Sequence, residues 1–244
     1  GLWNLAMRGI MNEQRARLGL KPVKNLLRNL MTDRPLLAAD SVLGPAPMSD
    51  GLEIVQTGAW FFSDPTPLPE SLEKFLASGE PPIYFGFGSI PNKTPSQTSK
   101  VLIEAARALG RRAIISQGWA GLDSVDDGDD CISIGPVSHE KLFPRVAAIV
   151  HHGGAGTTAA AARSGRPQVI VPHLLDQFYW RHRVQALGIG ISNVDIKQLN
   201  TRALIQALRD CLSEGIKSRA QALMSRIELH GASIAAKRIV REFA

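Results

Sequence analysis

The sequence contains little cysteine and no long apolar run. Cys131 and Cys211 are the two cysteines among its 244 residues, and neither stands at the spacing of a metal or redox motif. We interpret both as buried free thiols in a reducing cytoplasm. No apolar run approaches the ~18 residues that a membrane-spanning helix needs. No signal peptide is apparent and the chain starts at Gly1 rather than Met, so we expect a cytoplasmic protein and a truncated or processed chain.

Several common ligand motifs are absent as well. No lysine follows the last glycine of the glycine-rich run at residues 151–158, which excludes a P-loop, and the glycine spacing excludes the GxGxxG dinucleotide fingerprint. No pair of carboxylates has metal-ligand spacing, so we expect no metal and no cofactor. The net charge of +6 would suit nucleic acid, but the basic residues are scattered and no DNA- or RNA-binding motif is present. We therefore expect no nucleic-acid partner.

What the sequence does contain is an alternation of strand and helix patterns from Pro82 onward. Short apolar runs bounded by turn residues predict strands, and the segments between them have helical periodicity. Such alternation predicts an α/β fold, a Rossmann-like parallel sheet with helices on both faces. We expect strands near residues 83–87, 112–116, 131–134, 147–151 and 168–172, and helices near residues 96–109, 157–164, 177–187 and 200–213.

The flanking segments are less regular. Apolar residues at helical spacing predict a helix over residues 3–18, and a short strand is expected at residues 36–40. The proline-rich residues 51–80 are typical of a connection, which contains a short helix near residues 68–76. Residues 215–243 are expected to form one or two terminal helices, interrupted near Gly231.

The run of residues 151–158, His-His-Gly-Gly-Ala-Gly-Thr-Thr, lies between a predicted buried strand and a predicted helix. The unpaired amide groups of a first helical turn, together with the helix dipole, favour an anion at such a place. Thr157 and Thr158 would add hydroxyl donors, and His152 an imidazole donor. We predict a diphosphate site, with a plain tight connection as the alternative. His151 is interpreted as a strand-end residue that packs or forms hydrogen bonds.

The next predicted strand ends in a loop that contains His173, Asp176 and Gln177. Because the carboxyl ends of parallel strands share one edge of a sheet, this loop should face the diphosphate site. A carboxylate and an amide can bind sugar hydroxyls. Asp176 has a second interpretation as a general base that deprotonates an acceptor hydroxyl. Together, the two loops predict a ligand in which a diphosphate is joined to a sugar.

Six segments, in this order, resemble the donor half of GT-B glycosyltransferases of family 1, with sterol-glucosyltransferase-like and antibiotic-glycosyltransferase-like members most similar. The segments are residues 82–89, 116–119, 134–137, 142–145, 151–158 and 172–177. The resemblance covers residues 50–244 well and residues 1–50 more loosely. It implies a tail of the N-terminal acceptor-binding domain at residues 1–56, an interdomain linker at 57–81, and a nucleotide-sugar donor-binding domain with C-terminal crossover helices at 82–244.

The resemblance also implies roles for individual residues. The diphosphate would be bound by His152, Gly153, Gly154, Gly156, Thr157, Thr158, Gly88 and Ser89. The nucleobase would contact Trp119, Gly135 and Val137. The sugar would be bound by Asp176, Gln177 and His173.

The sequence departs from the plant branch of this family at two positions. Ile134 stands where plant members have a tryptophan that stacks on uracil, and Ala160 stands where they have a glutamate that holds the ribose. Trp119 is the expected replacement for the stacking surface. The missing glutamate leaves UDP and dTDP donors open, and the sterol-like resemblance favours UDP.

The activity that the resemblance implies is inverting, metal-independent transfer of a hexose, with glucose favoured. The donor would be a UDP-sugar and the acceptor a hydroxyl of a lipid-like, sterol-like or natural-product molecule. The family's catalytic base is a histidine in the N-terminal half, and no segment here matches it. Two alternatives stay open, namely a non-catalytic nucleotide-sugar-binding module of a split transferase and an epimerase of the same fold. Basic residues near the N-terminus suggest peripheral membrane contact, with a solvated helix face as the alternative: Arg8, Arg15, Arg17, Lys21, Lys24 and Arg28.

Overall fold

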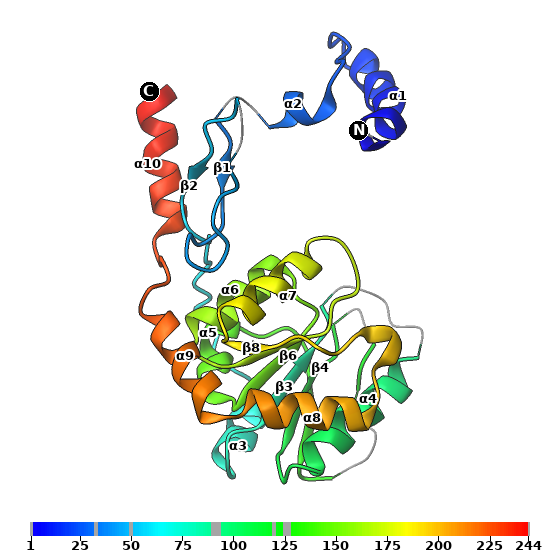
Figure 1. The fold of residues 1–244 in the computed structure, drawn as a ribbon, viewed down its shortest axis with the longest axis vertical. Helices are drawn as coiled ribbons and strands as arrows, with labels where there is room; N and C mark the ends of the chain where they lie inside the picture. The colour runs from blue at the N-terminus through cyan, green and yellow to red at the C-terminus, as the bar shows by residue number, and fades with distance from the viewer. Residues whose placement is uncertain are drawn as a thin grey trace.

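The computed structural model describes residues 2–31, 34–48, 51–88, 94–118, 121–123 and 128–243. Its centre is a six-stranded parallel sheet with the strand order β5-β4-β3-β6-β7-β8 (Figure 1). This is the Rossmann order, and the direction in which strands are added reverses between β3 and β6. The α/β fold that the sequence predicts is confirmed. The strands are β3 (Ile83–Gly86), β4 (Ala113–Ser116), β5 (Cys131–Ile134), β6 (Ala148–His151), β7 (Gln168–Ile170) and β8 (Gly190–Ile191).

The central strands are apolar on both sides because helices cover both faces of the sheet. Ile83 and Phe85 of β3 point to one face and Tyr84 to the other, and all three are buried. β3 pairs with β6 so that Gly86 lies opposite His151. The two strands therefore end at the same level, and the loops that follow them leave the sheet at one edge.

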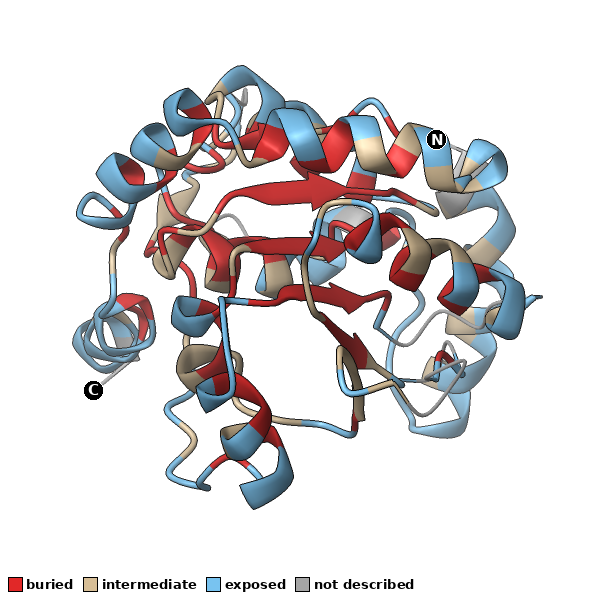
Figure 2. Cartoon of the chain, turned by 90° about the horizontal axis from the view of Figure 1, so that it is seen from below, coloured by how far each residue is buried: buried red, intermediate tan, exposed pale blue. Residues whose placement is uncertain are grey.

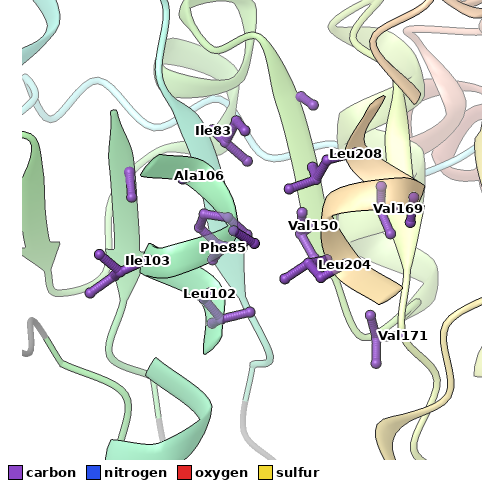
Figure 3. Packing of buried hydrophobic residues seen from close by; sticks show 14 of the residues in the cluster. Ile83, Phe85, Leu102, Ile103, Ala106, Val150, Val169, Val171, Leu204 and Leu208 are labelled. Atoms are coloured by element: carbon purple, nitrogen blue, oxygen red, sulfur yellow. The ribbon is translucent and has the colours of Figure 1, made fainter. Parts of the chain in front are cut away.

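Two helices, α4 (Pro95–Arg107) and α8 (Thr201–Cys211), cover one face of the sheet. Phe85, Leu102 and Leu204 meet there in the core (Figure 3). Figure 2 shows the buried strands between helices whose outer sides are exposed. The other face is covered by α3 (Glu70–Ala77), α5 (His139–Leu142), α6 (Ala155–Arg163), α7 (Gln177–Ala186) and α9 (Glu214–Met224).

The N-terminal residues form smaller elements at the periphery. These are α1 (Leu2–Arg17), α2 (Leu26–Leu30) and a two-stranded parallel sheet of β1 (Leu36–Leu37) and β2 (Val55–Gln56). The last helix, α10 (Gly231–Phe243), runs beside this small sheet (Figure 1). Arg34 links the two parts, because its side chain lies 2.9 Å from the Glu53 carboxylate and 3.7 Å from that of Glu242.

Residues that directly follow β1 pack into the main domain. Asp40 is buried, and its carboxylate accepts hydrogen bonds from the backbone N–H groups of Val42 (2.8 Å), Leu43 (3.0 Å) and Glu228 (2.8 Å). The guanidinium of Arg183 in α7 donates to the carbonyls of Leu43 (2.8 Å) and Val42 (3.1 Å). This short segment is therefore tied both to α7 and to the chain just before α10. The predicted division of the chain at residues 57 and 82 stays a prediction.

The structure adds elements that the sequence did not predict. The edge strand β8 is new, whereas the short helix α5 begins at His139, where the sequence Ser138-His139-Glu140 predicts a helix start. The 3-10 turns η1 (Phe143–Arg145) and η2 (Ile196–Gln198) follow α5 and β8 in the chain. The two predicted terminal helices are confirmed. They are α9 and α10, and residues 225–230 separate them. Among the described helices, none combines the length and the apolar character that crossing a membrane requires.

Candidate functional site

The loops after β3 and β6 meet at the carboxyl edge of the sheet, at the point where the strand order reverses. Gly88 follows β3 with φ +66°, and a Cβ atom there would lie 2.8 Å from Cε1 of His152. Gly153 follows β6 with φ +91°, and a Cβ atom there would lie 2.7 Å from Cγ2 of Ile170. Glycine is required at both positions by the backbone conformation and by the close approach of the neighbour. Crevices at such switch points are the common ligand sites of open α/β sheets.

His151, the last residue of β6, has a structural role. Its ring is fully buried, and Nδ1 accepts a hydrogen bond from the Gly153 N–H at 3.1 Å. Nε2 therefore has the proton and donates to Oε1 of Gln168 at 2.9 Å. Burial lowers the pKa of His151 to about 3, so the ring is neutral at pH 7. As the sequence indicated, this histidine forms hydrogen bonds at the strand end, where it shapes the glycine turn.

His152 occupies the middle of the crevice. Its half-buried ring lies close to two glycines, since a Cβ atom on Gly154 would lie 2.6 Å from Nε2 and one on Gly88 would lie 2.8 Å from Cε1. Burial lowers the pKa of His152, while the Gly86 backbone and the nearby Asp176 carboxylate raise it. The imidazole is therefore neutral at pH 7 and held at the edge of the sheet, next to the first turn of α6.

The N-terminus of α6 faces the same crevice. The helix begins at Ala155, so the N–H groups of Ala155, Gly156 and Thr157 have no partner within the helix. Such groups, with the positive end of the helix dipole, favour an anion. Thr158 differs from the prediction. Its hydroxyl and its N–H both donate to the Gly154 carbonyl at 2.9 Å and its side chain is buried, so the Thr158 hydroxyl is not available to a ligand in this structure.

The loop after β7 places Asp176 and Gln177 at this edge with different exposure. Asp176 is exposed, and its Oδ2 accepts a hydrogen bond of 3.0 Å from the indole of Trp180, which packs in the core. Gln177 is buried, and its Oε1 accepts from the backbone N–H groups of His173 (2.7 Å) and Leu174 (3.0 Å). The Gln177 oxygen therefore holds the loop in shape, and the amide NH₂ is the group of this side chain that could meet a ligand.

His173 lies at the other end of the same loop. Its ring packs against Phe87, with 5.4 Å between the ring centroids. Burial lowers the pKa of His173, and the neighbouring His152 lowers it further. The structure thus brings His152, His173 and Asp176 to one edge, as the sequence predicted for the strand ends. Their roles toward a ligand stay predictions.

Of the three residues predicted to contact the nucleobase, two lie together in one described turn. Gly135 and Val137 lie in the turn between β5 and α5, and a Cβ atom on Gly135 would meet open space. Ile134 is buried in the core beneath them. Ser89 and Trp119, which the sequence assigned to the diphosphate and the nucleobase, lie outside the described residues.

A cavity of about 490 Å³ adjoins the first turn of α6. Its lining residues include Val137 and, from α6, Gly156 and Ala160. The outer wall comes from the connecting segment, with Trp60 and Phe62 among its lining residues. Sequence reasoning missed this wall, although the run of aromatic residues at positions 60–62 stands out in a proline-rich connection. Within the described residues, no group of three or more His, Cys, Asp or Glu side chains could hold a metal ion.

Comparison with known proteins gives a consistent result. The family model described as "Erythromycin biosynthesis protein CIII-like, C-terminal domain" matches residues 113–230. Glycosyltransferase GtfE of Amycolatopsis orientalis is 46% identical over 226 residues, which are 93% of this chain and 54% of GtfE. Vancomycin aglycone glucosyltransferase from the same organism is 45% identical, over 94% of this chain and 55% of that protein. The chain belongs to the family 1 glycosyltransferases.

Within the family 1 glycosyltransferases, the chain corresponds to the C-terminal half, because the matching family model describes a C-terminal domain. The chain spans about half the length of these curated relatives (54% and 55%). Sterol 3-beta-glucosyltransferase UGT80A2 of Arabidopsis thaliana is 39% identical over 64% of this chain and 24% of that enzyme. Among solved structures, the glycotransferase of kitacinnamycin superposes with a TM-score of 0.73 at 18% identity, over 98% of this chain and 62% of that one. VinC in complex with dTDP gives 0.63 at 22% identity, over 83% and 52%. These structures establish the GT-B type of fold.

Proposed function

We propose that the chain binds the nucleotide-sugar donor of an inverting, metal-independent glycosyltransferase. The donor is a UDP-sugar, with glucose as the favoured hexose, and the acceptor is a hydroxyl of a lipid-like, sterol-like or natural-product molecule. The observation that carries this proposal is the meeting of Gly88, His152 and the N-terminus of α6 at the switch point of the sheet. Neutral hydrogen-bond donors and the positive end of a helix dipole lie together there, which favours an anion.

The chemistry follows from the charge that develops. The acceptor oxygen attacks the anomeric carbon, the bond from that carbon to the diphosphate breaks, and the diphosphate leaves with the electron pair. The N–H groups of Ala155, Gly156 and Thr157 and the ring of His152 stabilise the growing negative charge. A base in the other half of the enzyme takes the acceptor proton. Asp176, held by Trp180 at 3.0 Å, is the proposed contact for the sugar hydroxyls.

The relatives leave the nucleobase and the sugar to be tested. The similar proteins include a vancomycin aglycone glucosyltransferase and a dTDP-epi-vancosaminyltransferase. We favour UDP over dTDP on the sterol-glucosyltransferase resemblance, to which the 39% identity with UGT80A2 adds support. A second candidate is a nucleotide-sugar-binding module without its own catalysis.

The test is calorimetric titration of the chain with UDP, UDP-glucose and dTDP in EDTA, repeated with added Mg²⁺. We expect binding in EDTA that His152→Ala weakens by roughly ten- to a hundredfold, since hydrogen bonds to charged groups contribute about 1.5–3 kcal/mol. His182→Ala, a substitution of an exposed histidine on α7, is the matched control and should bind normally. Equal affinity in wild type and His152→Ala would overturn the site. Nucleotide release from UDP-glucose in the presence of acceptors distinguishes an active transferase from a binding module.

A further inference from the structure

The cavity beside α6 continues from the proposed diphosphate site. Gly156, in the first turn of α6, lines the cavity, as does Ala160 one turn later. Val137, from the turn after β5, also lines the cavity. A nucleoside attached to a diphosphate at the N-terminus of α6 would therefore extend into this cavity. Its volume of about 490 Å³ is in the range of small-molecule sites.

The connecting segment that closes the cavity is fixed to the domain. The ammonium group of Lys141 in α5 donates to the carbonyls of Pro65 (2.7 Å) and Thr66 (2.6 Å). The guanidinium of Arg163 in α6 stacks over the ring of Phe61, 4.8 Å from the centroid, and pairs with the Glu140 carboxylate at 2.7 Å. The segment is thus held against both α5 and α6, and its aromatic residues have a defined position.

Trp60 and Phe62 line this cavity with large exposed aromatic surfaces. Trp60 is 51% exposed although its indole N–H is anchored to Oγ1 of Thr57 at 2.9 Å, and Phe62 is 84% exposed. Trp60 and Gly156 also line a second, smaller cavity. An anchored indole next to a cavity provides a flat apolar surface without the entropy cost of ordering it on binding.

We infer that Trp60 and Phe62 of the connecting segment form the stacking wall for the donor's nucleobase. The inference rests on the proposed function. Ile134, at the position where plant relatives are expected to have the stacking tryptophan, is buried and has no ring. The aromatic surface comes instead from the connection, which closes the nucleoside cavity from outside. Base recognition in this chain then depends on a segment far from the glycine-rich loops in sequence.

The test separates the base from the phosphates. Wild type and the variants Trp60→Leu, Phe62→Leu and Trp60→Phe are titrated with UDP, UMP and inorganic pyrophosphate. We expect Trp60→Leu to weaken UDP and UMP about tenfold, as loss of an aromatic–base stack typically does, and to leave pyrophosphate unchanged. Phe62→Leu should have a smaller effect of the same kind, and Trp60→Phe should restore most of the affinity. Phe178→Leu, which removes an exposed ring on α7, is the matched control and should bind all three ligands normally.

Fluorescence gives a second measurement. The chain has four tryptophans, and UMP should quench or shift the emission of wild type but not of Trp60→Phe, which keeps the stack and removes the reporter. Wild-type affinity for UMP in both Trp60→Leu and Phe62→Leu would overturn the inference and leave the proposed function intact. A loss of UMP affinity confined to the variant Trp119→Leu would also overturn the inference, because it would assign the stacking contact to Trp119. If wild type bound no nucleotide, the proposed function itself would fail.

Discussion

The carboxyl edge of the large sheet and the N-terminal residues 2–31 are built in opposite ways. At this edge, buried groups form hydrogen bonds with one another, as in the chain of bonds from Gly153 through His151 to Gln168. In residues 2–31, Leu5 and Leu18 are about three-quarters exposed (75% and 74%), and contacts such as the Arg17–Glu13 pair lie in solvent. The proposed site therefore takes its shape from buried packing within this chain, so substitutions there should have large effects on stability and peripheral substitutions small effects.

The largest effect should come from the glycine turn after β6. Gly153→Ala places a Cβ atom 2.7 Å from Ile170 at φ +91°, so we expect the free energy of unfolding to fall by about 3 kcal/mol and nucleotide binding to be lost. Gly156→Ala is the control, because a Cβ atom there has no neighbour within 4 Å. It should raise the stability by about 0.5 kcal/mol, since alanine is the better helix former. Urea denaturation measures both. Equal stability of the two variants would contradict the prediction.

The next effect is a loss of stability in mild acid. Burial lowers the pKa of His151 to about 3 and that of His139 to about 4, both below the unfolded value of about 6.5. The contribution of each is complete above pH 6.5 and is lost as the pH falls, because the unfolded chain takes up the proton first. We expect a loss of about 2 kcal/mol between pH 6.5 and 5.5 for the two residues together.

His139→Phe tests the origin of this pH dependence. The His139 ring stacks on Phe143 at 4.2 Å, so phenylalanine should keep the packing and remove one titrating group. The loss of unfolding free energy between pH 6.5 and 5.5 should become smaller by about 1 kcal/mol, which is the contribution of one such histidine. An unchanged loss would show that other groups cause it.

The smallest effects should contrast two carboxylates that tie the N-terminal residues to the rest of the chain. Asp40 is buried and accepts three backbone N–H groups, so Asp40→Asn should cost about 1.5 kcal/mol. Glu53 pairs with Arg34 and Arg238 but is 58% exposed, so Glu53→Gln should change stability by less than about 0.5 kcal/mol. The stability of both variants is measured by thermal unfolding at low and high salt. Similar losses of stability in the two variants would contradict the predicted difference between buried and exposed contacts.

Much of the domain could be predicted from the sequence because its central strands are buried on both faces and read as continuous apolar runs. β3 and β6 are examples, and the order of strands and turns then places His152 and Asp176 at one edge. β8 was missed because Gly190–Ile191 is a two-residue edge strand without a pattern of its own. Local periodicity contains no information on such pairings.

Two features of the candidate site depend on contacts that no local pattern reveals. The hydroxyl of Thr158 can face a ligand or turn back to the Gly154 carbonyl, and the structure has the second arrangement. The aromatic wall at Trp60 forms because the connection returns to α5 and α6, about 80 to 100 residues later in the chain. That return is fixed by side chains such as Lys141 and Arg163, whose partners are backbone carbonyls and a ring rather than a recognisable motif.

The contacts of Asp40 have a consequence for constructing hybrid transferases. Ala39 and Leu43 are in the core with Trp180, and Arg183 and the Glu228 N–H take their acceptors from residues 40–43. A junction placed in the proline-rich connection would replace this segment with a foreign one. The Asp40 carboxylate that accepts from the Glu228 N–H, and the side chains that pack on Trp180, would then depend on the foreign sequence. The Asp176 carboxylate that Trp180 holds would then lose its support. A C-terminal half intended for exchange between enzymes should therefore include residues 36–48, even though they precede the connection in sequence.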